Sequence, residues 1–203
     1  RYIELDSLIA RLESRQGSIT ANHGKLYALR KCLQKPIDPA ATDDLYACLS
    51  VVRQGYRFVF ESEAETLVDK QSRTLGHEVQ RRRRIVTRSL YGIRKQREIL
   101  NPAKFGVYAI GLLINKILRR CLPVFLLGLF VSSLVLSWSS AWFLVLFLLQ
   151  SLFYGASLFY PLTSKWESPS SLGKPVQGLV SLITYFVCGN YGTLLGLADF
   201  LRG

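Results

Sequence analysis

Residues 42–60, TDDLYACLSVVRQGYRFVF, decide the fold expected for this chain. Thr42 can cap a helix whose first turn holds Asp43 and Asp44, where negative charge complements the helix dipole. Gly55 would end that helix, and the aromatic and β-branched run 56–60 predicts a buried strand. A helix, a glycine and a strand in close succession are typical of α/β layering. We therefore expect an α/β domain in the first part of the chain.

The charged residues are concentrated in the first 120 positions. The formal net charge is +12, yet only three of the 26 lysines and arginines lie further on, at Lys165, Lys174 and Arg202. This asymmetry predicts a polar, basic cytosolic part followed by a membrane domain. We expect the cytosolic catalytic part over 1–72, amphipathic membrane-interface helices over 73–122 and a transmembrane domain over 123–203. We expect spans at about 123–138, 141–160 and 176–198, the first two packed as a tight antiparallel hairpin.

The third span leaves two topologies open. Because lysine and arginine are abundant up to Arg120, that side is expected in the cytosol. The third span then begins on the cytosolic side. A full span with a kink at Gly189-Asn190 would leave Arg202 outside, whereas a break there would return Arg202 to the cytosol. We expect the full or nearly full span.

Residues 74–100 predict a long amphipathic helix. Val79, Val86, Ile93 and Leu100 recur every seven residues, and Arg81, Arg84 and Arg88 lie together on the opposite face. Arg83 falls on the apolar side and is expected to extend its charged end towards solvent. Such a ridge can be a solvated face, a patch for anionic lipid headgroups or part of an anion site.

Other motifs are few. Residues 2–14 predict a helix that Gly17 stops, and Asn22-His23-Gly24 is a loop that serves either as a hairpin turn or as a close backbone approach to a ligand. The sequence has no P-loop, no dinucleotide-binding glycine fingerprint and no zinc constellation. Its four cysteines lack metal or redox spacing, so we expect free thiols in a reducing compartment.

Several segments, in order, resemble one enzyme family. They are Leu12-Glu13-Ser14, NHGKLYALR at 22–30, Thr42-Asp43-Asp44-Leu45, GYRFVFE at 55–61 and EVQRRRRI at 78–85. This series resembles the C-terminal half of the catalytic domain of family 2 glycosyltransferases, especially membrane-integrated synthases similar to bacterial cellulose, hyaluronan and exopolysaccharide synthases. The resemblance covers essentially the whole chain. It implies a partial GT-A-type α/β domain ahead of the membrane helices.

The resemblance also implies roles for individual residues. The family's T-E-D motif appears as Thr42-Asp43-Asp44, which makes Asp44 the general base for the acceptor hydroxyl and Asp43 its neighbouring carboxylate. Asn22, His23 and Gly24 would line the donor and acceptor pocket. The first glycine of that family loop is Ala21 here.

The family's Q-x-x-R-W motif falls on the arginine run in two registers. One keeps Gln80 and loses the Trp, and the other reads Arg81-x-x-Arg84-Ile85. We prefer the second, because Arg81 and Arg84 share a helix face. The resemblance then implies that Gln80, Arg81 and Arg84 bind substrate, the arginines neutralising the departing pyrophosphate. The missing Trp leaves open whether transfer is processive.

The resemblance places the metal site elsewhere. In this family the uridine-binding strand and the D-x-D motif for Mg²⁺ or Mn²⁺ come before the point where this chain starts, and residues 1–203 contain no D-x-D. We expect those ligands upstream, no metal ligands within 1–203, and no catalysis by this chain alone.

The expected function is a membrane-embedded inverting glycosyltransferase of the bacterial inner membrane, multi-pass, with a cytosolic catalytic part. Its partners would be a nucleotide-sugar donor, a polysaccharide or lipid-linked acceptor, the bilayer, and an accessory subunit or further copies of the chain. The alternative is a non-catalytic membrane scaffold or receptor whose basic lobe binds lipid headgroups. A nucleic-acid partner is not expected, because the basic residues lie close to the membrane and lack an interleaved aromatic platform.

Overall fold

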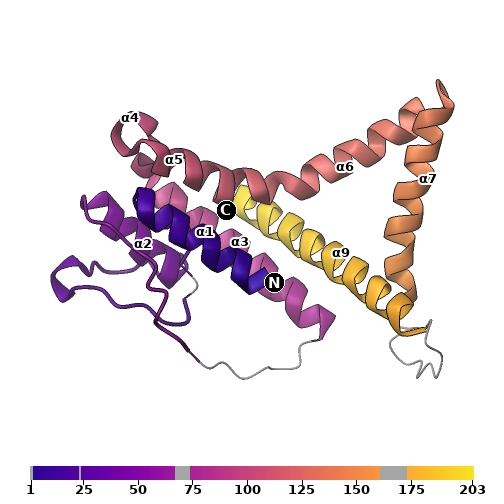
Figure 1. Cartoon of the computed structure of the whole chain (residues 1–203). Helices are drawn as coiled ribbons and strands as arrows, with labels where there is room; N and C mark the ends of the chain where they lie inside the picture. The colour runs from indigo at the N-terminus through magenta and orange to yellow at the C-terminus, as the bar shows by residue number, and fades with distance from the viewer. Residues whose placement is uncertain (1, 23, 67–73, 161–172) are drawn as a thin grey trace. The chain divides into compact units, whose positions relative to one another are not determined.

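The computed structural model describes residues 2–22, 24–66, 74–160 and 173–203, and its regular elements are helices (Figure 1). Three helices lie where the sequence predicted them. They are α1 (Tyr2–Gln16), α2 (Asp43–Arg53) and α3 (Leu75–Lys95), the last followed by the short 3-10 helix η2 (Arg97–Leu100). A second 3-10 turn, η1 (Lys31–Leu33), lies in the connection to α2.

The prediction of an α/β domain is wrong: the described part of the chain contains no strand and no sheet. Residues 56–60 belong to no regular element, and Phe58 is buried as expected, but only one backbone bond joins them to residues 14–19, from Ile19 N to Phe58 O at 2.9 Å. The neighbouring amides of Phe58 and Phe60 donate instead to the hydroxyls of Ser18 and Ser14. A β ladder needs repeated backbone pairing, which these serine side chains replace.

The chain divides into two compact units. The first contains Arg1–Ser72, Arg84–Arg120 and Leu197–Gly203, and the second contains Arg73–Arg83 and Cys121–Gly196. The core of the first unit is formed by α2 together with side chains of α1, α3 and α5: Ala10, Ile19, Leu45, Cys48, Leu49, Val51, Val52, Phe58, Ile93, Ile99 and Leu112. Burial raises the pKa of the Cys48 thiol to about 12, so this cysteine stays a neutral core residue.

The interface helix and the first span, expected as separate elements, form one helical stretch, Val107–Leu136. It follows α4 (Pro102–Phe105) and consists of α5 (Val107–Leu112), the π-helical segment η3 (Leu113–Leu118) and α6 (Arg119–Leu136). Pro123 lies inside α6 rather than at the start of a helix.

Two helices, Val107–Leu136 and Val176–Arg202, are long and apolar enough to cross a membrane. Only 11% of each apolar window is buried by protein. The core helix of a water-soluble protein would be mostly covered, so these surfaces suit a lipid environment. The intervening α7 (Ala141–Ala156) is apolar but shorter, and it continues into the 3-10 turn η4 (Ser157–Phe159).

In the second unit, α6 and α7 form a helical hairpin joined by a short turn, and the two helices diverge away from that turn (Figure 1). Gln150 of α7 donates to the Ser133 hydroxyl of α6 at 3.2 Å, and the rings of Phe130 and Phe147 lie 5.3 Å apart. The last helix, α9 (Gly173–Arg202), runs unbroken through Gly189-Asn190, so the break considered for that position does not occur. The connection that contains Lys165 lies outside the described residues.

Candidate functional site

Gly24 lies directly against Asp44, the second residue of the acidic pair at the start of α2. Gly24 has φ +66°, and a Cβ added there would lie 2.7 Å from Asp44 Oδ2. Only glycine can adopt this conformation and leave room for that carboxylate. Asn22 Oδ1 accepts a hydrogen bond from Gly24 N at 3.4 Å, while Asn22 Nδ2 is buried with no partner among the described residues. His23 lies outside the described residues.

The two aspartates differ in their surroundings. Asp43 is exposed, whereas Asp44 is half-buried. Asp44 Oδ1 accepts from the Leu45 amide at 2.7 Å, and its Oδ2 faces the loop. Thr42 occupies the N-cap position, but its side chain makes no capping bond. Asp44 is therefore the carboxylate held in a fixed position, and one of its oxygens is turned towards the Asn22–Gly24 loop.

The C-terminal half of α3 fastens the segment that leads into this site. The Arg88 guanidinium donates to Pro39 O at 3.1 Å and to Ala41 O at 2.5 Å. Lys95 Nζ lies 3.7 Å from Asp38 Oδ2. Further along the same face, a Cβ on Gly92 would lie 3.3 Å from the Ala41 methyl, and Gln96 Nε2 donates to Tyr46 O at 3.2 Å. Arg88 is therefore a positioning residue for Thr42–Asp44, a role that helix periodicity alone did not reveal.

The arginine run does not act as one ridge. Arg81 and Arg82 both pair with Glu78, at 3.5 Å and 3.0 Å, and these three residues belong to the second unit, as does the exposed Gln80. Arg84, in the first unit, is exposed. The half-buried position of Arg83, beside exposed neighbours, agrees with its predicted place on the apolar side of α3. Within the first unit the structure brings Asn22, Gly24 and Asp44 together, whereas Gln80 and Arg81 belong to the second unit.

A polar network that the sequence analysis missed ties α1 to the membrane-directed helix. Glu13 accepts from Thr20 N at 2.8 Å, from Thr20 Oγ1 at 2.6 Å and from Asn115 Nδ2 at 3.1 Å. Asn115 Nδ2 also lies 2.9 Å from Thr20 Oγ1. A signal for this network was present, because Asn115 interrupts an otherwise apolar run. A half-buried amide in such a run needs a polar partner.

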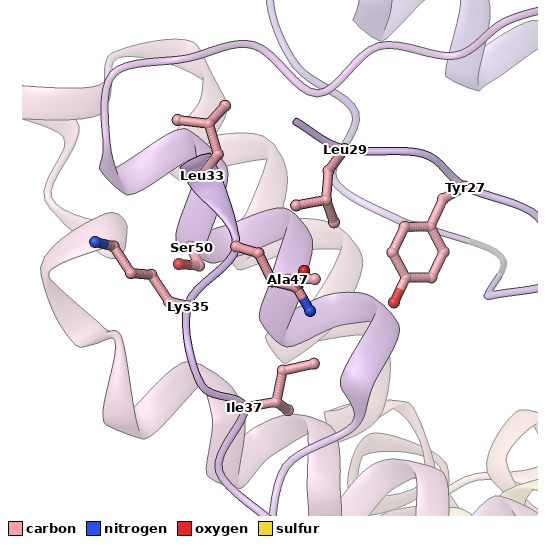
Figure 2. A pocket seen from close by; sticks show the side chains of 8 residues that line it. Tyr27, Leu29, Leu33, Lys35, Ile37, Ala47 and Ser50 are labelled. Atoms are coloured by element: carbon pink, nitrogen blue, oxygen red, sulfur yellow. The ribbon is translucent and has the colours of Figure 1, made fainter. Parts of the chain in front are cut away.

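A small pocket lies beside α2, and Figure 2 shows the side chains around it. Its volume of about 30 Å³ is enclosed mainly by apolar groups, with Gln34 and Lys35 at its margin. Such a space holds one or two water molecules and is too small for a sugar. We therefore assign no substrate to it.

The described residues contain no group of three or more His, Cys, Asp or Glu side chains able to hold a metal ion. All four cysteines are free thiols. No family model, no curated protein and no solved structure matches the chain.

Proposed function

We propose that the protein is part of a membrane-embedded inverting glycosyltransferase that transfers a sugar from a nucleotide-sugar donor to a growing polysaccharide or lipid-linked acceptor. The observation that carries the proposal is the half-buried Asp44, fixed at the start of α2 with one oxygen facing the Asn22–Gly24 loop. The proposal concerns this site and the apolar helices, and it includes no sheet.

Asp44 would act as the general base. A sugar hydroxyl is a poor nucleophile, and a positioned carboxylate that takes its proton contributes roughly 10²–10⁴-fold to the rate. As the acceptor oxygen forms a bond to the anomeric carbon, the bond from that carbon to the nucleoside diphosphate breaks and the configuration inverts. The proton passes to Asp44, and the diphosphate leaves with the bonding electrons.

The departing diphosphate needs cations, for which we propose Arg81 and Arg84, with Gln80 beside them. Arg84 is exposed and makes no ion pair with the described residues, whereas part of the Arg81 charge is compensated by Glu78. Mg²⁺ or Mn²⁺ would supply further positive charge in this reaction. The described residues do not fit a metal ion, so its ligands would have to come from outside them.

The test is release of nucleoside diphosphate from a panel of nucleotide sugars by the full-length protein in its membrane. Asp44→Asn should abolish transfer while donor binding is kept, and Asp43→Asn, as the exposed neighbour, should retain most of the turnover. Substantial turnover by Asp44→Asn would remove this assignment. Arg84→Ala should slow transfer more than Arg83→Ala, and the opposite order would favour the register that begins at Gln80.

The alternative, a non-catalytic membrane scaffold or receptor that binds lipid headgroups, is favoured by one observation. Arg81 and Arg82 keep side-chain exposures of 46% and 54% although they pair with Glu78. If no donor in the panel is turned over, and binding to anionic vesicles falls when Arg81, Arg82 and Arg84 are replaced by Gln, the scaffold reading is correct.

A further inference from the structure

The π-helical segment η3 (Leu113–Leu118) lies within the helix that leads into the first apolar span. Such segments are rare and occur frequently at functional sites, because the wider turn redirects side chains. This one is held against the first unit: Asn115 bonds to Glu13 and Thr20, and Ile117 packs against the buried core. A Cβ on Gly111 would lie 3.2 Å from the Thr20 methyl, so the preceding turn is equally close. These contacts on either side fix the backbone of the lysine at position 116, between Asn115 and Ile117.

That lysine, Lys116, follows Asn115, which bonds to Thr20 just ahead of the Asn22–Gly24 loop that contacts the candidate base. It interacts electrostatically with Asp44, which attracts it, and with Arg119 and Arg120, which repel it. It also interacts with Cys48, the core residue one turn after Asp44 on α2. Asp44 is the carboxylate that acts on Lys116 in this group.

Two cations of this group, Lys116 and Arg120, lack a paired carboxylate within the described residues. No carboxylate there lies within 4.0 Å of Lys116 or Arg120, and Arg120 Nη1 is buried without a hydrogen-bond partner. Asn22 Nδ2, in the loop beside Asp44, is another buried donor without a partner there. Unpaired buried donors and like charges held together are costly, and an anion with several oxygens would relieve both costs.

We propose that Lys116 and Arg120 form a binding subsite for a phosphate group next to Asp44. The subsite deepens the proposed function and rests on it only in placing that phosphate beside the base. A phosphate offers several acceptor oxygens and up to two negative charges, which match the Lys116 ammonium and the free Arg120 nitrogen. Two sources share this chemistry: the phosphate of a lipid presented by the bilayer, and the phosphate of a soluble nucleotide or its diphosphate product.

The first experiment measures binding of two probes to the full-length protein in nanodiscs. Inorganic pyrophosphate tests the soluble source, and phosphatidic acid added to a phosphatidylcholine bilayer tests the lipid source. We call the probe that the wild-type protein binds more tightly the favoured probe. Lys116→Gln should weaken its binding by about 10–100-fold, as expected for loss of a charged hydrogen bond. Lys116→Arg should retain most of the binding. The matched control is Lys104→Gln, which removes an equal charge from an exposed lysine of the same unit.

A second measurement needs no variant and so does not depend on the folding of one. An amine-reactive reagent labels the wild-type protein, and the favoured probe should protect Lys116 but leave Lys104 reactive. If Lys116→Gln loses binding of pyrophosphate alone, the soluble source is identified. If it loses binding of phosphatidic acid alone, the lipid source is identified. Unchanged binding of both probes by Lys116→Gln, an equal loss in Lys104→Gln, or absence of selective protection would each overturn the proposal. Neither assay requires turnover, so a failure of Asp44 as the base would be seen separately.

Discussion

Replacing Arg88 by Ala should loosen the segment that leads into Asp43 and Asp44 while the rest of α2 stays folded. The substitution removes the two hydrogen bonds that the guanidinium donates to Pro39 O and Ala41 O. A hydrogen bond from a charged donor contributes about 1.5–3 kcal/mol when buried, and less where water can replace it. Arg88 is half-buried, so about 1 kcal/mol for each bond, or about 2 kcal/mol together, is a reasonable expectation.

Hydrogen exchange of the backbone amides measures this loss directly. A local opening that is about 2 kcal/mol easier makes exchange about 30-fold faster, since 1.4 kcal/mol corresponds to a factor of ten. The effect should appear at the amides of Ala41 and of the first turn of α2, and amides of α1 should keep their protection. The protein is measured in the same detergent or nanodisc preparation as the wild type, and turnover should fall with the loss of protection.

Arg84→Ala is the matched control, because it removes an equal charge from the same helix at an exposed position. It should leave the exchange of Ala41 and the first turn of α2 unchanged. The reasoning about Arg88 is refuted if Arg88→Ala exchanges at the wild-type rate in this segment. It is equally refuted if Arg84→Ala accelerates exchange there to the same extent, since general loss of positive charge would then be the cause.

Three further predictions follow from particular contacts. Gly24→Ala should reduce transfer strongly, because φ at Gly24 is +66° and the new methyl would lie 2.7 Å from Asp44 Oδ2. In the control Gly17→Ala the new methyl meets nothing within 4 Å, so its effect on transfer should be mild. Equal activity of the two variants in the diphosphate-release assay would contradict this. The exposed Cys32 should react with a water-soluble maleimide at pH 8 while Cys48, whose burial raises its pKa to about 12, stays unmodified until the protein is denatured, and mass spectrometry of the labelled peptides reads this out. A cysteine at position 202 should be labelled from the side of the membrane that carries Arg94, because the Arg94 guanidinium of α3 lies 5.3 Å from the ring centre of Phe200, near the end of α9. Labelling only from the opposite side would restore the topology first expected from the sequence.

The disposition of the positive charges shows how far sequence patterns reach. The seven-residue spacing of Val79, Val86 and Ile93 predicted α3 and placed Arg83 on its apolar side, and the structure agrees. The same pattern grouped Arg81, Arg84 and Arg88 by direction. It could not tell that Glu78 pairs with Arg81 or that Arg88 turns to the carbonyls of Pro39 and Ala41, 47 or more residues earlier in the chain.

The mistaken strand has a similar origin. Residues 56–60 have the composition of a strand, and Phe58 is buried as the alternation suggests. Strand propensity reports how well side chains suit a half-buried extended segment, but a sheet also needs a neighbour that offers backbone groups in register. Here the neighbour offers the hydroxyls of Ser14 and Ser18, so the segment is not part of a sheet.

The sequence by itself determined the helices α1, α2 and α3, the α6–α7 hairpin and the separation of a basic half from an apolar half. Each of these depends on periodicity, capping and composition within a short stretch of chain. The tertiary structure alone decided that Gly24 meets Asp44 and that Asn115 joins Glu13 and Thr20. Those contacts join residues 20 to 102 positions apart, and the partner that a long polar side chain takes depends on which groups the packed core brings within its reach.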